Sequence, residues 1–169
     1  MLLGLTEIMN MPGSSLDFET SLDLSNLDFG GCCPAKQPVT ALGSVRNTAG
    51  VLLMQGEVRT RLFGVCARCA QDFERDVVFP LEAVLVTELA REENEDEWVF
   101  QLIDGCADLD DIVTTTFVLN MDTKLLCSED CKGLCCRCGA NLNLGPCQCK
   151  PEIDPRFAVL QQLLKDQNR

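Results

Sequence analysis

The strongest constraint on this chain is the density of cysteine in one short stretch. Seven of its twelve cysteines lie in the 23 residues from Cys127 to Cys149. Only a bound metal or a set of disulfides explains so many thiols so close together. Clustered cysteines in a reducing compartment favour metal over disulfides, and the chain has no histidine to contribute. We therefore predict that this stretch is a zinc-binding segment whose ligands are thiolates.

Eight of the cysteines form four pairs with short spacing, and two tetrahedral zinc sites require eight ligands. In one arrangement the last two pairs close a local site, because residues 139–146 between them hold the turn formers Asn, Gly and Pro. The first two pairs then meet across 57 residues as a long-range clip. The predicted ligands, in order, are Cys66, Cys69, Cys127, Cys131, Cys135, Cys138, Cys147 and Cys149.

Other arrangements of the same thiols stay open at this stage. The middle two pairs could share one site while the outer two pairs share the other. The chain could also hold a single zinc, and Cys136 could replace one of the ligands. The sequence assigns no role to Cys32, Cys33 or Cys106.

Hydrophobic patterning predicts a β-rich body. Apolar residues at every second position indicate strands, and helical spacing after a run of aspartates indicates a helix over residues 108–121. A second helix is expected near the C-terminal end, where Asp154 suits the N-cap and Pro155 the first turn. The expected strands span residues 14–24, 39–48, 51–63, 73–87 and 98–103.

These elements predict an α+β fold: a β-rich antiparallel sheet or barrel-like body, one or two helices, and a C-terminal cysteine-rich zinc segment. We expect residues 14–126 to form the body, with its helix near 108–121, and residues 127–169 to form the zinc segment and C-terminal helix. Pro80 is expected to mark a bulge, an edge or a break in its strand, since proline has no N–H to donate to a sheet.

The chain is strongly acidic, with a formal net charge of −12. Each closed four-thiolate zinc site adds −4 + 2 = −2, so metal binding makes the protein more acidic still. Such a charge argues against broad binding to phosphate, which requires Lys and Arg. It favours a basic partner, or an RNA contact confined to a small patch. The candidates for that patch are Arg59, Arg61, Arg68 and Arg75.

The apolar start of the chain does not have the pattern of a signal peptide, because it lacks a positive n-region and contains Glu7. No apolar run approaches the roughly 18 residues that cross a bilayer. We therefore expect a soluble, cytoplasmic protein with no membrane partner.

The sequence offers no group of residues suited to catalysis, so we expect that the protein is not an enzyme. Closed four-thiolate zinc sites have no open coordination position, and the chain has no nucleophile elbow and no phosphate-cradling glycine loop. One alternative is a redox sensor or thiol–disulfide protein that uses Cys66-Ala-Arg-Cys69, although the βαβ setting of thioredoxin-like proteins is missing. Another is a general nucleic-acid-binding zinc ribbon, which the net charge disfavours.

Several motifs together resemble the large ribosomal RNA subunit accumulation protein family of bacteria and plastids. The more specific of them begin at Cys131-Lys-Gly-Leu-Cys135 and continue to Asp154-Pro-Arg-Phe-Ala. The others are Cys66-Ala-Arg-Cys69 with the Ala-Gln-Asp-Phe that follows it, the acidic run at 88–97, and the Asp-Leu-Asp-Asp-Ile of the predicted helix start. Cys136 stands where proline is common in this family.

The resemblance implies a non-enzymatic role in the accumulation or processing of 23S rRNA during biogenesis of the large ribosomal subunit. The partners it implies are the pre-ribosomal large subunit, the 23S rRNA or a basic ribosomal protein. It also implies a β-rich body with a helix and an appended zinc segment, in agreement with the residue patterns.

Overall fold

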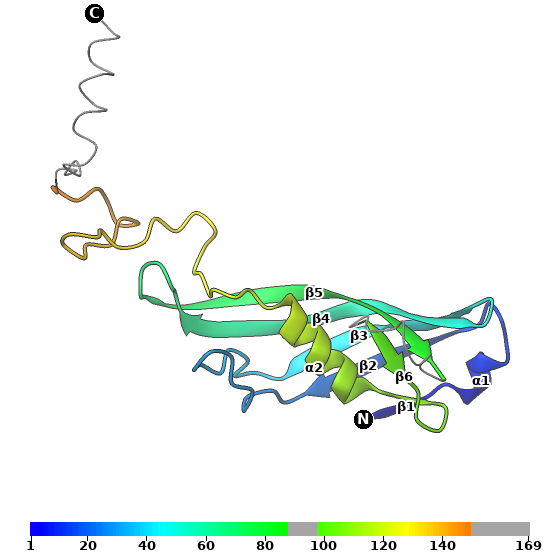
Figure 1. Cartoon of the computed structure of the whole chain (residues 1–169). Coiled ribbons are helices and arrows are strands. Elements are labelled where there is room, and N and C mark those ends of the chain that lie inside the picture. The colour runs from blue at the N-terminus through cyan, green and yellow to red at the C-terminus, as the bar shows by residue number, and fades with distance from the viewer. Residues whose placement is uncertain (88–97, 150–169) are drawn as a thin grey trace, which may run out of the picture.

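The computed structural model describes residues 1–87 and 98–149, and its largest element is a five-stranded sheet (Figure 1). The strands are β2 (Ser15–Leu22), β3 (Val39–Thr48), β4 (Val51–Val65), β5 (Asp72–Val86) and β6 (Val99–Gln101). They lie in the order β2-β3-β4-β5-β6. The first four are antiparallel to their neighbours, whereas β6 pairs in parallel with β5.

Four smaller elements complete the described fold. They are β1 (Leu2–Gly4), the short helix α1 (Thr6–Met9), β7 (Cys106–Asp108) and the helix α2 (Leu109–Asn120). β1 and β7 form a separate antiparallel pair. The predicted α+β fold class is confirmed, and the sheet is open with β2 and β6 at its edges rather than closed into a barrel.

The alternation of side chains along the strands gives the sheet one apolar face. In β4 the buried side chains are Leu52, Met54, Val58 and Leu62, at every second or fourth position. The residues between them, such as Glu57 and Arg59, lie on the opposite face. Because successive side chains of a strand point to opposite faces, this pattern buries one side of the sheet and leaves the other in water.

Helix α2 covers the apolar face (Figure 1). The carboxylate of Asp108 accepts a hydrogen bond from the Asp110 N–H at 3.1 Å and so caps the first turn. Ile112, Val113 and Phe117 are buried between helix and sheet. The Phe117 ring meets that of Phe79 on β5 edge-on, with 6.0 Å between centroids. The helix lies within the predicted range 108–121.

β4 and β5 form a long hairpin whose pairing runs from Leu52↔Leu85 to Val65↔Asp72. Pro80 is accommodated opposite Glu57 without a break in β5. Among the described residues β6 pairs only with the last part of β5, Val84 to Val86. Pro80 therefore lies where β5 is an edge, which is where a residue without an N–H is tolerated.

After α2 the chain runs to the far end of this hairpin, away from α1 (Figure 1). There the Ala67 N–H donates to the Leu125 carbonyl at 2.8 Å. The end of the hairpin and the start of the cysteine-rich segment are thus held together. The predicted acidic run at 88–97 and the predicted C-terminal helix lie outside the described residues. Within residues 1–87 and 98–149, no helix is long and apolar enough to span a membrane.

Candidate metal centre

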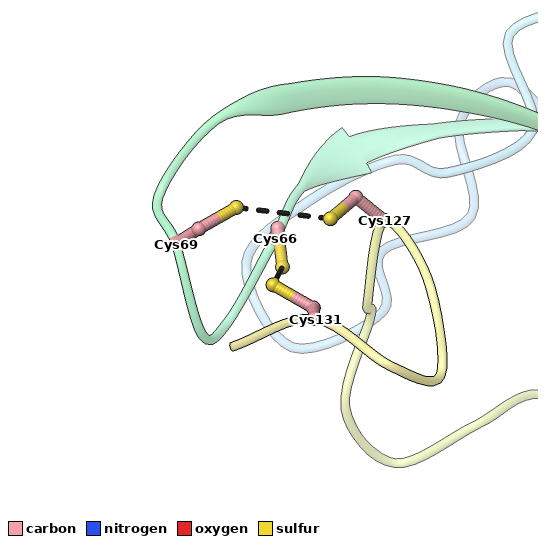
Figure 2. A group of neighbouring side chains, drawn as sticks. All are labelled: Cys66, Cys69, Cys127 and Cys131. Atoms are coloured by element: carbon pink, nitrogen blue, oxygen red, sulfur yellow. Dashed lines mark hydrogen bonds between the residues drawn. The ribbon is translucent and has the colours of Figure 1, made fainter. Parts of the chain in front are cut away.

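Four cysteine sulfurs converge at the end of the β4–β5 hairpin, and we call them the hairpin group: Cys66, Cys69, Cys127 and Cys131 (Figure 2). All four Sγ atoms lie within 4.8 Å of one another. The sulfurs of Cys66 and Cys131 are 3.7 Å apart, as are those of Cys69 and Cys127. A tetrahedral zinc site with Zn–S near 2.3 Å has edges of about 3.8 Å, whereas disulfide sulfurs lie about 2.05 Å apart. The spacing therefore fits four ligands of one ion.

A tight turn between β4 and β5 brings the first two of these ligands together. The Cys66 N–H donates to the Gln71 carbonyl, and the Ala70 N–H donates to the Cys66 carbonyl, both at 2.8 Å. Ala70 takes a φ of +54°, in the left-handed region that few residues other than glycine adopt. The turn directs the backbone N–H groups of Arg68 and Cys69 at the Cys66 sulfur, where they stabilise a thiolate.

The hydrogen bonds around the hairpin group favour thiolates at two of its sulfurs. Burial raises the pKa of the Cys66 thiol, but backbone hydrogen bonds, led by that from Cys127, outweigh it and bring the pKa down to about 6. A hydrogen bond from the Asn143 side chain lowers the pKa of Cys131. The hydrogen bond to Cys131, followed by burial, raises the pKa of Cys127 to about 12. A divalent cation in the group would displace the protons that remain.

The other four predicted ligands form a second cluster, which we call the loop group: Cys135, Cys138, Cys147 and Cys149. Their sulfurs also lie within 4.8 Å of one another, and those of Cys135 and Cys147 are 3.4 Å apart. The Gly139 N–H donates to the Cys135 carbonyl at 2.9 Å, and Gly139 takes a φ of +70°. Glycine adopts this φ at no steric cost, so the turn after Cys138 closes easily.

In the loop group, as in the hairpin group, the hydrogen bonds favour a thiolate at one sulfur and a protonated thiol at another. Backbone hydrogen bonds from Cys138 and Arg137 lower the pKa of Cys135 to about 6. A hydrogen bond to Cys138, followed by burial, raises the pKa of Cys149 to about 12. The environment differs, because no member of the loop group is fully buried, whereas Cys66, Cys69 and Cys131 of the hairpin group are.

The eight predicted ligands therefore lie as in the first of the predicted arrangements. The first two pairs form the hairpin group, and the last two pairs form the loop group. The arrangement in which the middle two pairs share a site is not the one formed. Cys136 is exposed and belongs to neither group, and Cys32, Cys33 and Cys106 also lie outside both.

Arg68 holds the two halves of the hairpin group together. Its guanidinium Nη1 donates to the carbonyls of Glu129 and Cys131, at 2.8 and 3.1 Å. Its own carbonyl accepts the Leu134 N–H at 3.0 Å. Arg68 thus joins the β4–β5 turn to the loop that carries Cys131, a structural role that the sequence did not reveal. The sequence feature that could have indicated this role is the position of Arg68 between Cys66 and Cys69.

The other arginines proposed for RNA contact are engaged in ion pairs. Arg59 pairs with Glu57, and Arg75 lies 3.1 Å from an oxygen of Asp122. Arg61 binds both oxygens of Asp76, at 2.6 and 3.1 Å, and this hydrogen bond holds the pKa of Asp76 below its usual range. RNA contact by these residues stays a prediction, and their acidic partners count against it.

Together, the open sheet, its covering helix and the two four-thiolate groups define a β-rich protein with an appended cysteine-rich segment able to hold metal ions. Residues 54–164 match the family described as large ribosomal RNA subunit accumulation protein YceD. The chain belongs to this family, and the resemblance of its motifs is confirmed. The match contains all eight cysteines of the two groups.

Individual relatives agree with the family match. The large ribosomal RNA subunit accumulation protein YCED homolog 1, chloroplastic, of Zea mays is 27% identical over an alignment of 193 positions. The alignment covers 96% of this chain and 66% of the maize protein. An uncharacterized protein of Mycobacterium tuberculosis is 30% identical over 122 residues, or 71% of this chain and 59% of the relative. The chain thus spans less than two thirds of the length of these relatives. No solved structure matches it.

Proposed function

We propose that this protein is a non-enzymatic assembly factor that supports accumulation and processing of 23S rRNA in the large ribosomal subunit, and that zinc stabilises its structure. The observation that carries the proposal is membership in the large ribosomal RNA subunit accumulation family over residues 54–164. The name of the maize relative, a large ribosomal RNA subunit accumulation protein homolog, supports the same role. We propose that the protein acts in the cytoplasm.

Zinc in both groups is supported by the chemistry of the donors. Each group offers four sulfurs at the spacing of a tetrahedron and backbone N–H groups that stabilise thiolates. Four protein ligands leave no open position for water or substrate, which is typical of structural rather than hydrolytic zinc. This is the physical support for a function without catalysis.

The charge distribution supports a basic protein as the direct partner rather than bulk RNA. The chain carries a net charge of −12, and the arginines proposed for phosphate contact already bind carboxylates or backbone carbonyls. On the outer face of β5 the side chains of Glu74 and Asp76 are 62% and 72% exposed, and these two carboxylates share a single cation, Arg61, so the three side chains keep a net negative charge. An acidic surface steers a basic ribosomal protein towards it and repels RNA.

Depletion of the protein in its native host tests the assembly role. We expect mature 23S rRNA to fall relative to 16S rRNA and precursors of the large subunit to accumulate. Full depletion with unchanged 23S rRNA would refute the proposal. Complementation then separates the partners: the double variant Arg59→Glu, Arg61→Glu should rescue, whereas a variant with the carboxylates of residues 92–97 replaced by amides should not. The opposite result would favour direct RNA contact.

The metal is tested by elemental analysis of protein purified under anaerobic conditions. We expect one zinc ion for each group. A redox sensor that works through free dithiols would instead carry little metal and a full complement of reactive thiols, so the same sample distinguishes this alternative.

A further inference from the structure

The two cysteine groups are joined by the side chain of Asn143. Its Nδ2 donates to the Cys131 sulfur of the hairpin group at 3.3 Å, and its Oδ1 accepts the Lys132 N–H at 2.8 Å. Asn143 itself belongs to the loop between Cys138 and Cys147, two ligands of the loop group. A side chain from the loop that connects two members of the loop group therefore contacts a cysteine of the hairpin group.

The position of Asn143 depends on the fold of its own loop. Its backbone N–H donates to the Asn141 side chain at 2.9 Å. The neighbouring Leu142 N–H donates to the Gly133 carbonyl at 2.9 Å, and Leu134 forms a β-bridge with Asn141. These contacts are few and lie near the surface, where Asn143 is exposed. Cys138 and Cys147, on either side of Asn143, would add to these contacts if they hold a metal.

We propose that Asn143 is a positioning residue that couples the two metal centres, so that metal in the loop group strengthens metal binding in the hairpin group. The proposal rests on the proposed metal binding. When the loop group is closed around an ion, Asn143 is held where its N–H faces the Cys131 thiolate. An N–H donor spreads the negative charge of the thiolate and fixes the direction of the sulfur, as outer hydrogen bonds do for metal ligands generally.

The coupling is reciprocal, because two sites that affect each other must do so by the same free energy. The groups nevertheless differ in how easily they lose metal. The hairpin group is largely buried, whereas Cys138 is exposed and its partners are half-buried. A chelator therefore reaches the loop group first. Loss of that metal releases Asn143 and weakens metal binding in the hairpin group, so the exposed loop group is linked to the end of the β4–β5 hairpin.

The test is a double-mutant cycle on the full chain loaded with cadmium, which takes the same thiolate ligands and gives a separate NMR signal for each site. Asn143→Asp keeps the oxygen that accepts the Lys132 N–H but replaces the donor to Cys131 with a carboxylate. The double variant Cys147→Ser, Cys149→Ser empties the loop group. Asn26→Asp, at an exposed turn outside both groups, adds the same charge and serves as the control.

Cadmium affinity of the hairpin group is measured by competition with a chelator. We expect Asn143→Asp and the emptied loop group each to lower it roughly 10–100-fold, while Asn26→Asp leaves it unchanged. The triple variant should lose no more than the larger of these effects, since both changes remove the same contact. Full additivity, or an Asn143→Asp protein that matches the control, would overturn the coupling.

A spectroscopic readout keeps the proposal testable if a variant binds too weakly to titrate. Relative to the parent protein, the cadmium signal of the hairpin group should shift in the variant with an emptied loop group, and it should shift in the same direction in the single variant Asn143→Asp. A hairpin-group signal indifferent to both changes would overturn the proposal. Absence of any cadmium signal from the hairpin group in the parent would instead refute the metal proposal itself, and so the two failures are distinguishable.

Discussion

The two cysteine groups each bring four sulfurs together but are built from different parts of the chain. The hairpin group joins the turn at Cys66 and Cys69 to a segment that begins 58 positions after Cys69, at Cys127. The loop group is complete within residues 135–149. The first group is mostly buried, and the second faces solvent.

This difference determines what each metal can stabilise. A cross-link between distant segments removes more conformational freedom from the unfolded chain than one that closes a short loop. The hairpin group therefore fixes the path of the chain after α2, whereas the loop group orders its own residues. Neither group lies in the main core, because the buried residues around α2 form a cluster separate from that of Cys66, Cys69 and Cys131.

The largest expected effect comes from Cys66→Ser, which removes a buried ligand of the hairpin group. Structural zinc contributes roughly 10–16 kcal/mol of apparent binding free energy, and we expect most of that to be lost. Hydrogen exchange should show loss of protection at the end of the hairpin, residues 62–75, and throughout 125–149. The core residues under α2 should keep theirs. Loss of protection across the whole sheet would mean that the hairpin group supports the core directly.

A smaller and more local effect is expected from Cys147→Ser in the loop group. The metal of that group should be lost and residues 135–149 should exchange freely, because the remaining backbone contacts of the loop are few. Zinc should stay in the hairpin group at a reduced affinity. Elemental analysis with hydrogen exchange measures both. A protein that loses both metals completely would show that the groups are one unit, and the comparison between them would fail.

Two glycines with nearly equal values of φ give a matched test within the cysteine-rich segment. Gly133 has φ +74° and Gly139 has φ +70°. A Cβ at Gly139 meets nothing within 4 Å, whereas one at Gly133 lies 2.9 Å from the backbone carbonyl oxygen of Arg68. Gly139→Ala should cost about 1–2 kcal/mol from the left-handed conformation alone. Gly133→Ala should cost more, because the junction of the loop with the β4–β5 turn must also open.

Zinc affinity of each group in these two variants is the measurement. Gly133→Ala should weaken the hairpin group and Gly139→Ala the loop group. If both variants changed the zinc affinity of the hairpin group equally, the close approach of Gly133 to Arg68 would not contribute to metal binding there.

Much of this architecture follows from local sequence patterns. Alternation predicted the four long strands to within a few residues, and the aspartates at 108, 110 and 111 predicted the start of α2, since caps and strand periodicity are local properties. The grouping of cysteines was one of several open arrangements, because a single zinc site and ligation by Cys136 were open as well as the second pairing. Spacing alone did not decide between them, because contact between Cys69 and Cys127 depends on where the whole chain runs after α2.

The contacts that connect the groups were not predicted. Arg68 reads in the sequence as a basic surface residue, and only the structure shows its guanidinium on the carbonyls of Glu129 and Cys131. Asn143 reads as a turn former, as asparagine usually does. Its donor reaches a sulfur 12 residues away in sequence, a relation set by three-dimensional folding. The boundary between the predicted body, residues 14–126, and the predicted zinc segment, residues 127–169, stays a prediction. The hairpin group contains cysteines from both sides of this boundary.

The smallest expected effect concerns the ion pair of Arg61 and Asp76, which face each other across β4 and β5 near the hairpin group. The hydrogen bond and charge of Arg61 hold the pKa of Asp76 below its ordinary value of 3.8. A carboxyl group with a lowered pKa in the folded state stabilises the protein above its ordinary pKa. That stabilisation is lost as the pH falls through the lowered value.

Both side chains are exposed, so water and salt screen the pair. Arg61→Gln should therefore leave the unfolding midpoint at neutral pH within experimental error, while an NMR titration shows the pKa of Asp76 returning to its ordinary range. Because the pKa of Asp76 is lowered in the folded parent, we also expect the parent and Arg61→Gln to have equal stability at a pH below both the lowered and the ordinary pKa of Asp76. If Arg61→Gln instead exposed the hairpin end to hydrogen exchange as fully as Cys66→Ser does, ion pairs across β4 and β5 would hold that end. The hairpin group would then not be the clamp that distinguishes it from the loop group.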